Sequence, residues 1–338
     1  MGSIPERRLP VMADVAKEAG VSHQTVSRVL NDHPNVRPDT RARVEEAIRR
    51  LGYRRNLVAR ALVTKRSRTL GVVSFDTTLY GPASTVYGIE QAARTAGYFV
   101  SVVSLKSIDA GNVTDAIAYL TEQGVDGVVV VAPQRSAGRA LASLPAGTPV
   151  VAVEGAHRAE VPVVCIDQIE GARLATRHLL DLGHETVWHV MGPPDWLETE
   201  GRLEGWRSAL EQAGRPVPEP LAGDWSPRAG YQAGRRLAAM DGVTAIFAGN
   251  DQMALGVLRA LSEEGVKVPG QISVVGFDDI PESEFFSPPL TTVRQDFAMV
   301  GRHCIEVLLR QIDSGPTGPE RLVVPPGFVV RSSTAPAR

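Results

Sequence analysis

The stretch VMADVAKEAGVSHQTVSRVLN (residues 11–31) predicts two short helices joined by a tight turn. Apolar residues recur at helical spacing on both sides of Gly20, and glycine accepts the positive φ that such a turn requires. Ser22 stands where an N-cap hydroxyl accepts a free backbone N–H, so the second helix should begin near His23. This stretch therefore decides the fold of the front of the chain.

The outward face of the second helix is polar and allows two interpretations. In a helix-turn-helix, the start of the second helix enters the major groove of DNA, where Gln24 can pair with adenine and Arg28 with guanine. In an ordinary helical hairpin, the same side chains would form a solvated face.

The distribution of charge favours the first interpretation. Residues 1–68 contain 15 Lys and Arg against 7 Asp and Glu, a net charge of +8, whereas the remainder contains 21 against 31, a net −10. A basic head on an acidic body is typical of a protein whose head binds a polyanion. An incidental surface asymmetry is the alternative.

A third helix is expected to begin at Pro38 and to end before Gly52, because apolar residues recur at helical spacing between them and close a three-helix core. The basic segment that follows, residues 56–68, has no core-facing stripe of its own. We expect it to fold on DNA, with Leu62 as an apolar wedge in the minor groove. The alternative is a plain basic linker.

From Thr69 onward, short β-rich runs alternate with helical patterns. One series extends to about residue 166, and a second begins near residue 185. This alternation predicts an α/β core of two doubly wound parallel sheets behind the all-α head, because 338 residues exceed what one core usually holds. A ligand would bind in the cleft between the lobes, at the carboxyl ends of the strands.

Several function classes find no support in the sequence. It contains no nucleophile elbow, no paired metal-ligand motif and no phosphate loop of recognised spacing, so we expect neither an enzyme nor a cofactor or metal site. Cys165 and Cys304 lie in apolar contexts and should be buried free thiols. No signal peptide or membrane span is evident, which predicts a cytoplasmic protein rather than an exported solute receptor.

The front of the chain resembles the headpiece and hinge of the LacI family of bacterial transcription regulators. The resemblance is carried by ADVAKEAGVSHQTVSRVLN, RVEEAIRRLGY and NLVARAL, and it continues to the C-terminus. It implies a helix-turn-helix headpiece, a hinge helix and a two-lobed, periplasmic-binding-protein-like core. The implied bounds are headpiece 1–55, hinge 56–68 and core 69–338, with lobe 1 at about 69–166 and 295–324 and lobe 2 at about 167–294 and 325–338.

The resemblance also implies the DNA contacts, residue by residue. It further implies a homodimer that reads a roughly palindromic double-stranded operator. The implied base-reading residues are His23, Gln24 and Arg28; the phosphate or groove contacts are Ser22, Thr25, Ser27 and Asn31; the minor-groove contacts are Ala59 and Leu62.

For the cleft, GDWS, AGNDQMALG, ISVVGFDD and PPLTTVRQDF resemble segments of sugar-responsive members of the family. Carboxylates and amides suit vicinal hydroxyls, and a Trp face suits a pyranose ring. Glu198 falls where a small residue would be expected, and the loop with Asp76 and Tyr80 departs from an apolar counterpart, which leaves the second-sugar or aglycone preference open. The implied effector-binding residues are Asp76, Glu154, Arg202, Trp225, Asn250, Asp278, Gln295 and Phe297.

The function expected from these features is that of a repressor controlled by a small effector, a sugar or glycoside acting as inducer. A regulator of the same fold that is corepressed by a nucleobase or another metabolite is the alternative, and a sugar receptor or an enzyme belongs to a different class. No heptad tail follows RLVVPPGFVVRSS, so we expect a dimer rather than a tetramer.

Overall fold

A computed structural model describes residues 10–53, 64, 66–105, 110–131, 133–135, 141, 147–154, 161–315 and 317–337. The chain divides into two compact units, Met1–Ser67 and Arg68–Arg338. The predicted hinge contacts Ala59 and Leu62 lie outside the described residues.

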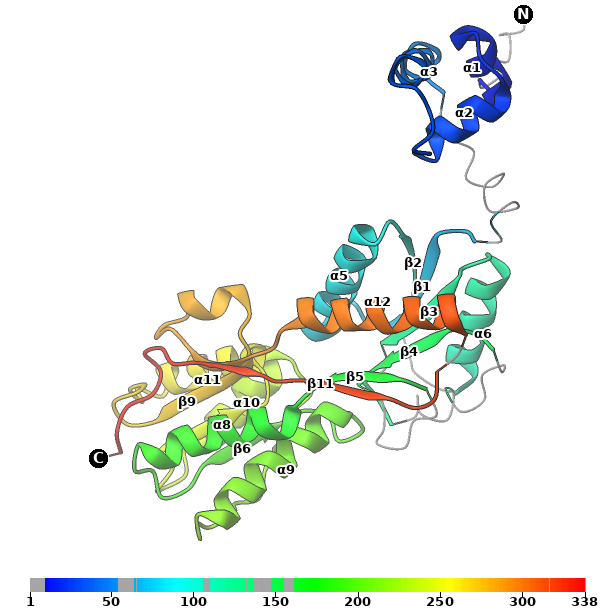
Figure 1. Cartoon of the computed structure of the whole chain (residues 1–338). Coiled ribbons are helices and arrows are strands. Elements are labelled where there is room, and N and C mark those ends of the chain that lie inside the picture. The colour runs from blue at the N-terminus through cyan, green and yellow to red at the C-terminus, as the bar shows by residue number, and fades with distance from the viewer. Residues whose placement is uncertain are drawn as a thin grey trace, which may run out of the picture. The chain divides into compact units, whose positions relative to one another are not determined.

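The first unit contains three helices, α1 (Met12–Ala19), α2 (His23–Leu30) and α3 (Pro38–Leu51) (Figure 1). Gly20 ends α1 with a φ of 64°, and the hydroxyl of Ser22 accepts the backbone N–H of Thr25 at 3.1 Å. Val15, Val26 and Val44, one from each helix, are fully buried against one another. The predicted helix-turn-helix with a third closing helix is confirmed.

The first lobe of the second unit is a six-stranded parallel sheet in the order β11-β5-β4-β3-β1-β2. Helices α5 (Tyr80–Thr95) and α12 (Phe297–Ser314) cover one face, and α6 (Ala110–Glu122) covers the other. Strands buried on both faces explain the nearly continuous valine runs in the sequence. The strands are β1 (Thr69–Phe75), β2 (Phe99–Leu105), β3 (Gly127–Val131), β4 (Val150–Val153), β5 (Val163–Ile166) and β11 (Arg321–Val324).

The second lobe repeats this plan with the strand order β12-β10-β9-β8-β6-β7. Helices α8 (Gln168–Asp181) and α9 (Leu197–Gln212) pack on one face, and α10 (Pro227–Ala238) and α11 (Asp251–Glu263) pack on the other. The strands are β6 (Trp188–Met191), β7 (Leu221–Ala222), β8 (Ala245–Ala248), β9 (Ser273–Asp278), β10 (Thr291–Arg294) and β12 (Gly327–Val329), and a short 3₁₀ helix spans Pro281–Phe285. The predicted pair of doubly wound sheets is confirmed.

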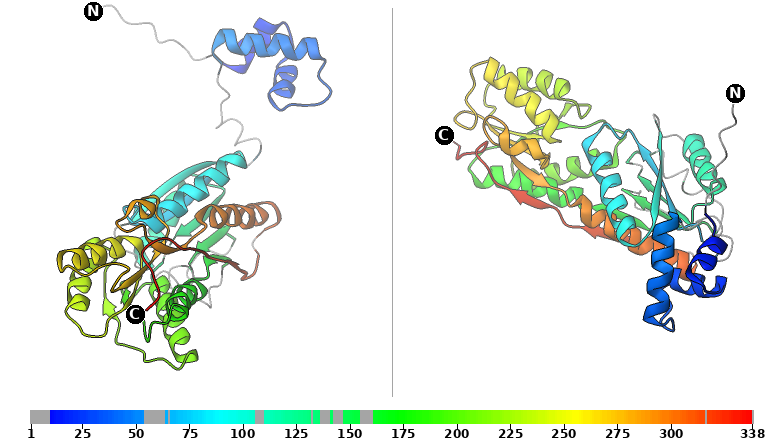
Figure 2. Two further views of the ribbon diagram at one scale, coloured as in Figure 1. Left: turned by 90° about the vertical axis from the view of Figure 1, so that its left-hand side faces the viewer. Right: turned by 90° about the horizontal axis from the view of Figure 1, so that it is seen from above.

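The chain passes between the two sheets three times: from β5 to α8, from β10 to α12 and from β11 to β12. The last crossing, coloured red, extends along both lobes (Figure 1 and Figure 2). Only residues 325 and 326 separate β11 from β12, so the chain enters the second sheet at its carboxyl edge. For that reason β12 pairs antiparallel with β10, with Arg294 opposite Gly327, an exception to the predicted parallel sheet.

Two helices that border the cleft begin without a start signal in the sequence. Helix α5 begins at Tyr80 and α9 at Leu197. The N-caps, Leu79 and Trp196, make no side-chain capping hydrogen bond, so the usual start signal is absent. Residues that line the cleft from these segments are therefore held on helices.

Cys165 on β5 and Cys304 on α12 are buried free thiols, as predicted. Among the helices that the structure describes, none has the length and hydropathy needed to cross a bilayer.

The close approach of α5 and α12 gives a test of the first lobe. A Cβ added at Gly301 would collide with the backbone of Gly88. We expect Gly301→Val to lower the free energy of unfolding of the core by about 1–3 kcal/mol or more, measured by urea denaturation. Gly318→Ala is the matched control, because its Cβ would meet nothing within 4 Å. Equal denaturation midpoints for Gly301→Val and wild type would contradict this packing.

Candidate functional site

The predicted DNA-contacting side chains of the headpiece lie on α2 and its caps. His23, Gln24 and Arg28 are exposed, while Val26 and Val29 on the opposite side of the helix are buried. Ser22 is the N-cap and Asn31 the C-cap, both exposed, and Thr25 and Ser27 are partly buried. One polar helix face thus presents these residues together.

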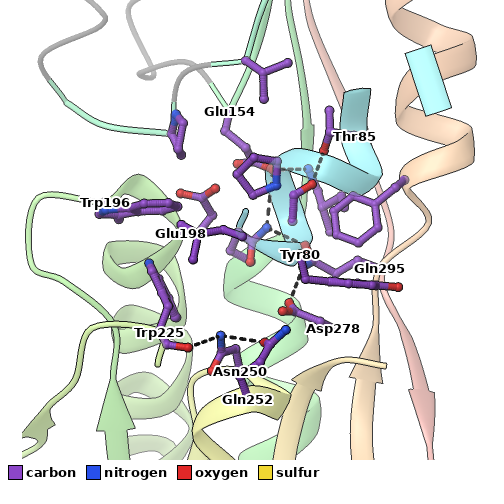
Figure 3. Close-up of a pocket in the computed structure, with 18 of the residues that line it drawn as sticks. Tyr80, Thr85, Glu154, Trp196, Glu198, Trp225, Asn250, Gln252, Asp278 and Gln295 are labelled. Carbon is purple, nitrogen blue, oxygen red and sulfur yellow. Dashed lines mark hydrogen bonds between the residues drawn. The ribbon is translucent and has the colours of Figure 1, made fainter. Parts of the chain in front are cut away.

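A cavity of about 260 Å³ lies where the carboxyl ends of the two sheets face each other. Residues of both lobes line it, as expected for a doubly wound fold (Figure 3). The polar and aromatic lining residues are Thr78, Tyr80, Thr85, Glu154, Gln168, Trp196, Glu198, Arg202, Trp225, Ser226, Asn250, Gln252, Asp278, Gln295 and Phe297.

Seven of the eight predicted effector-binding residues line this cavity: Glu154, Arg202, Trp225, Asn250, Asp278, Gln295 and Phe297. The eighth, Asp76, does not. Its carboxylate accepts the backbone N–H and the hydroxyl of Thr78, at 3.1 and 2.5 Å, and so closes the turn before α5.

Sequence reasoning missed other lining residues. Gln168 follows Asp167 directly after β5, a position at the carboxyl end of a strand that could have been singled out. Trp196 is the N-cap of α9 and was not among the predicted residues. Gln252, Ser226 and Thr85 gave no signal of their own, because polar residues are common in loops and in the first turns of helices.

Arg202 is the centre of the polar network in the cavity. Its side chain is 5% exposed, and Nε donates to Oε1 of Gln168 at 2.9 Å. Nη1 donates to the carbonyl of Gly249, and Nη2 lies 3.6 Å from Oδ1 of Asp278. The guanidinium also stacks over Phe277, 3.8 Å from the ring centre. These contacts compensate the cost of burying a cation.

Gln168 connects this network to the first lobe. Its Nε2 donates to Oε1 of Gln295 at 3.0 Å and to Oε1 of Glu154 at 3.4 Å. Gln295 in turn donates to Oδ1 of Asp278 at 2.6 Å (Figure 3). Two residues beside the inter-lobe crossings, Gln168 and Gln295, therefore bond directly to each other.

Carboxylates outnumber cations around the cavity. Burial raises the pKa of Asp278 to about 6, although Arg202 opposes the shift. Burial also raises the pKa of Glu154, and burial followed by the charge of Glu154 raises that of Glu198 well above its ordinary value. Behind the lining, burial and the charge of Asp278 raise the pKa of Asp251 to about 7. The site is thus rich in carboxyl groups that tend to keep their protons and that can then donate as well as accept.

Backbone strain is concentrated at the same place. Glu154, Trp225 and Asp278 have φ values of 56°, 71° and 112°, in a region that non-glycine residues seldom occupy. Such conformations persist only where the surrounding contacts hold them, and they cluster at binding sites.

The first turn of α9 touches both the cavity and the first lobe. Trp196 forms a β-bridge with Gln134, and the backbone N–H of Leu197 donates to the carbonyl of Pro133 at 2.8 Å. Arg135 and Glu200 form an ion pair at 3.0 Å across the same junction. Contacts between the lobes therefore adjoin the lining residues Trp196 and Glu198.

The geometry defines a binding site. Within the described residues, no group of His, Cys, Asp and Glu is arranged to hold a metal ion. The lining offers acceptors, amides and aromatic faces to one small polar molecule held between two lobes. A helix-turn-helix unit and a two-lobed binding core on one chain define the class of ligand-responsive DNA-binding proteins.

Comparison with known proteins narrows this class. Residues 11–56 match the family described as bacterial regulatory proteins, lacI family, and residues 176–334 match the periplasmic binding protein-like domain. The chain belongs to the LacI family of transcription regulators and is not an enzyme.

Three relatives align over nearly the whole chain. The transcriptional regulator CelR of Thermobifida fusca is 36% identical over 340 residues, which cover 97% of this chain and 99% of CelR. The lactose operon repressor of Escherichia coli K12 is 34% identical over 329 residues, 95% of this chain and 89% of that repressor. The repressor PurR of Haemophilus influenzae KW20 is 33% identical over 334 residues, 96% of this chain and 98% of PurR.

Solved structures agree with these alignments. The lac repressor dimer bound to operator and the anti-inducer ONPF superposes with a TM-score of 0.85 at 32% identity, covering 97% of this chain and all of that one. The complex of CelR with cellobiose gives a TM-score of 0.70 at 33% identity, covering 96% and 99%.

The Arg202 network predicts a pH-dependent defect. Arg202→Met removes the charge that lowers the pKa of Asp278, so this pKa rises from its value of about 6. A carboxyl whose pKa is raised on folding stabilises the fold at low pH and loses that contribution as pH rises through the folded-state pKa. We expect a loss of about 3–5 kcal/mol in unfolding free energy at pH 8 and a smaller loss at pH 5.

Urea denaturation of wild type and variant at both pH values measures this difference. The double variant Arg202→Met/Asp278→Asn should recover much of the loss at pH 8, because no buried carboxylate is then left beside the missing cation. A defect of equal size at pH 5 and pH 8 would contradict the charge pairing.

Proposed function

We propose that this protein is a homodimeric repressor whose affinity for a roughly palindromic operator is set by a sugar or glycoside bound between the lobes. The bound effector acts as an inducer and weakens DNA binding. Residues 1–55 form the headpiece, 56–68 the hinge and 69–338 the effector-binding and dimerisation core in this proposal.

DNA reading by α2 is supported by its exposed polar face. Gln24 and Arg28 lie one turn apart on an exposed surface, with side chains able to make bidentate contacts to adenine and guanine. The lac repressor relative is bound to operator as a dimer, which supports the same arrangement here. Ser22, Thr25, Ser27 and Asn31 would contact phosphates or the groove, and Ala59 and Leu62 would enter the minor groove.

The observation that carries the effector class is the cavity itself. Three lining carboxylates, three amides of Asn250, Gln168 and Gln295, and the rings of Trp196 and Trp225 match the hydroxyls and apolar faces of a sugar. The relative CelR is known in complex with cellobiose, which supports a sugar for this chain. A planar nucleobase would favour a stacked aromatic sandwich with fewer carboxylates.

Control by ligand follows from linkage. A ligand that prefers an arrangement of the lobes other than the DNA-bound one must weaken DNA binding, and DNA must weaken ligand binding by the same factor. The contacts between the lobes at the start of α9 adjoin the cavity. A bound ligand can therefore alter these contacts.

Corepression by a purine is the second candidate, because PurR is 33% identical over 96% of this chain. A thermal-shift panel of sugars and purines separates the two. Stabilisation by a sugar and not by any purine supports the proposal. Stabilisation by a purine alone replaces it with the second candidate.

Substitutions on α2 test the proposed DNA reading. Gln24→Ala and Arg28→Ala should each lower the preference for operator over random duplex by roughly fivefold or more, while weak salt-dependent binding persists. Fluorescence anisotropy with both duplexes measures the ratio. Arg43→Ala, which removes an exposed charge from α3, is the matched control and should keep the ratio. Unchanged discrimination in Arg28→Ala would refute its base-reading role.

A substitution in the cavity tests the proposed effector site. Asp278→Asn replaces a buried acceptor by a group of equal size and should weaken sugar binding roughly tenfold or more, with operator affinity retained. Isothermal titration calorimetry measures the affinity for the sugar that the thermal-shift panel identifies. Asp241→Asn, on the exposed surface of the same lobe, should bind as wild type does. Full sugar affinity in Asp278→Asn would place the site elsewhere.

A further inference from the structure

Glu198 is a cavity residue that has one carboxyl oxygen without a hydrogen-bond partner among the described residues. It lies in the first turn of α9 and lines the cavity, and its Oε2 is buried with no hydrogen-bond partner among the described residues. A buried carboxyl oxygen without a hydrogen-bond partner is costly. Its presence in the wall of a binding cavity therefore needs an explanation.

The one arginine that lines the cavity within the described part of the chain does not provide a hydrogen bond to Glu198. Arg202 donates to Gln168 and to Gly249, and it forms its ion pair with Asp278. Burial, followed by the negative charge of Glu154, raises the pKa of Glu198 well above its ordinary value. A hydroxyl of a bound molecule, which can donate or accept, would satisfy Glu198 where the protein does not.

A second unused polar group lies in the same wall. The indole Nε1 of Trp225 is buried and has no partner in the part of the chain that the structure describes. The ring of Trp196 stands edge-on to that of Trp225, with ring centres 5.6 Å apart, and edge-on to Phe75 at 5.7 Å. One acceptor, one donor and aromatic surface are the groups that a hydroxylated ring requires.

The side chains of Glu198, Trp196 and Trp225 lie outside the hydrogen-bonded chain of Gln168, Gln295 and Asp278, although the backbone carbonyl of Trp225 accepts from Nδ2 of Asn250 at 3.1 Å. Figure 3 shows Trp196 and Glu198 on one side of the pocket, with Asp278 and Gln295 on the other. Asp278 and Gln295 are bonded to each other, and Asn250 caps α11 through the backbone N–H of Met253. The unused groups therefore gather on the side formed by the first turn of α9 and by Trp225.

We propose that Glu198, Trp196 and the indole N–H of Trp225 form a second polar subsite that takes a hydroxyl-bearing ring of the effector. The effector is then a disaccharide-like glycoside, with one ring beside Asp278 and Gln295 and a hydroxylated second ring against Glu198. This inference rests on the proposed sugar-responsive function and specifies its ligand. Glu198 then selects against glycosides whose second group is an apolar aglycone.

The subsite also has a mechanical consequence. Trp196 precedes Glu198 by two residues and Glu200 follows it by two. Trp196 contacts the first lobe through the β-bridge to Gln134, and Glu200 does so through the ion pair with Arg135. A second ring that binds Glu198 thus acts on the same helical turn that joins the lobes. A single ring bound only beside Asp278 would leave this turn without a ligand contact.

Calorimetry on the full chain tests the subsite. The probes are glucose, galactose, cellobiose, lactose and the 4-nitrophenyl β-glycosides of glucose and galactose. Wild type should bind one of the disaccharides more tightly than the monosaccharide and the nitrophenyl glycoside that share its first ring. Glu198→Gln should weaken that disaccharide roughly tenfold or more and change the monosaccharide less than about twofold.

Two further variants serve as controls. Glu204→Gln changes an exposed carboxylate on the same helix and should keep every affinity. Glu198→Ser, whose small side chain opens the wall, should shift the preference toward the nitrophenyl glycoside, and its thermal unfolding shows whether the fold is retained.

The outcomes separate this inference from the proposed function. If wild type binds a sugar but Glu198→Gln weakens all probes equally, or none, the second subsite is refuted and the sugar-responsive function stands. If no sugar of the panel binds wild type, the proposed sugar function fails and the subsite fails with it.

Discussion

The burial of one guanidinium group, that of Arg202, is the constraint on which the cleft depends. A buried cation is tolerated only when its charge and its N–H groups are satisfied. Asp278 at the end of β9, the carbonyl of Gly249 after β8 and the amide of Gln168 at the start of α8 meet this requirement together. Since Gln168 also bonds Gln295 and Glu154, the same requirement links the second lobe to the first. A ligand that competes for these groups is expected to change how the lobes meet.

Much of the architecture could be predicted because local rules and the global fold agree. Gly20 predicts the turn of the headpiece because glycine accepts a positive φ, and Ser22 predicts the start of the second helix because its hydroxyl can cap it. The structure shows both features. The valine-rich runs mark strands buried on both faces. The position of the cleft followed from a general property of parallel sheets, and the residues that it brings together were named through the family resemblance.

The remainder depended on contacts between distant segments. Tyr80 and Glu198 lie on helices whose N-caps carry no capping side chain, so the sequence held no signal for where those helices begin. Asp76 follows a strand as a binding residue would, yet its carboxylate is used by the adjacent Thr78. The role of Gln168 is evident only once two crossings of the chain are side by side. Strand β12 is antiparallel because the connection from β11 is too short for the chain to reverse its direction. The hydrophobic pattern of the sequence does not reveal the direction of a strand.

Reciprocal linkage between the operator site and the effector site is the most direct test of a sensor that controls DNA binding. The operator affinity of the full chain would be measured by fluorescence anisotropy with and without saturating sugar, using a palindromic duplex selected from a random pool, and the sugar affinity with and without that duplex. We expect the sugar to lower the affinity for the operator, and the operator to lower the affinity for the sugar, by the same factor of roughly 5–150. An operator affinity that is identical with and without the bound sugar would contradict it.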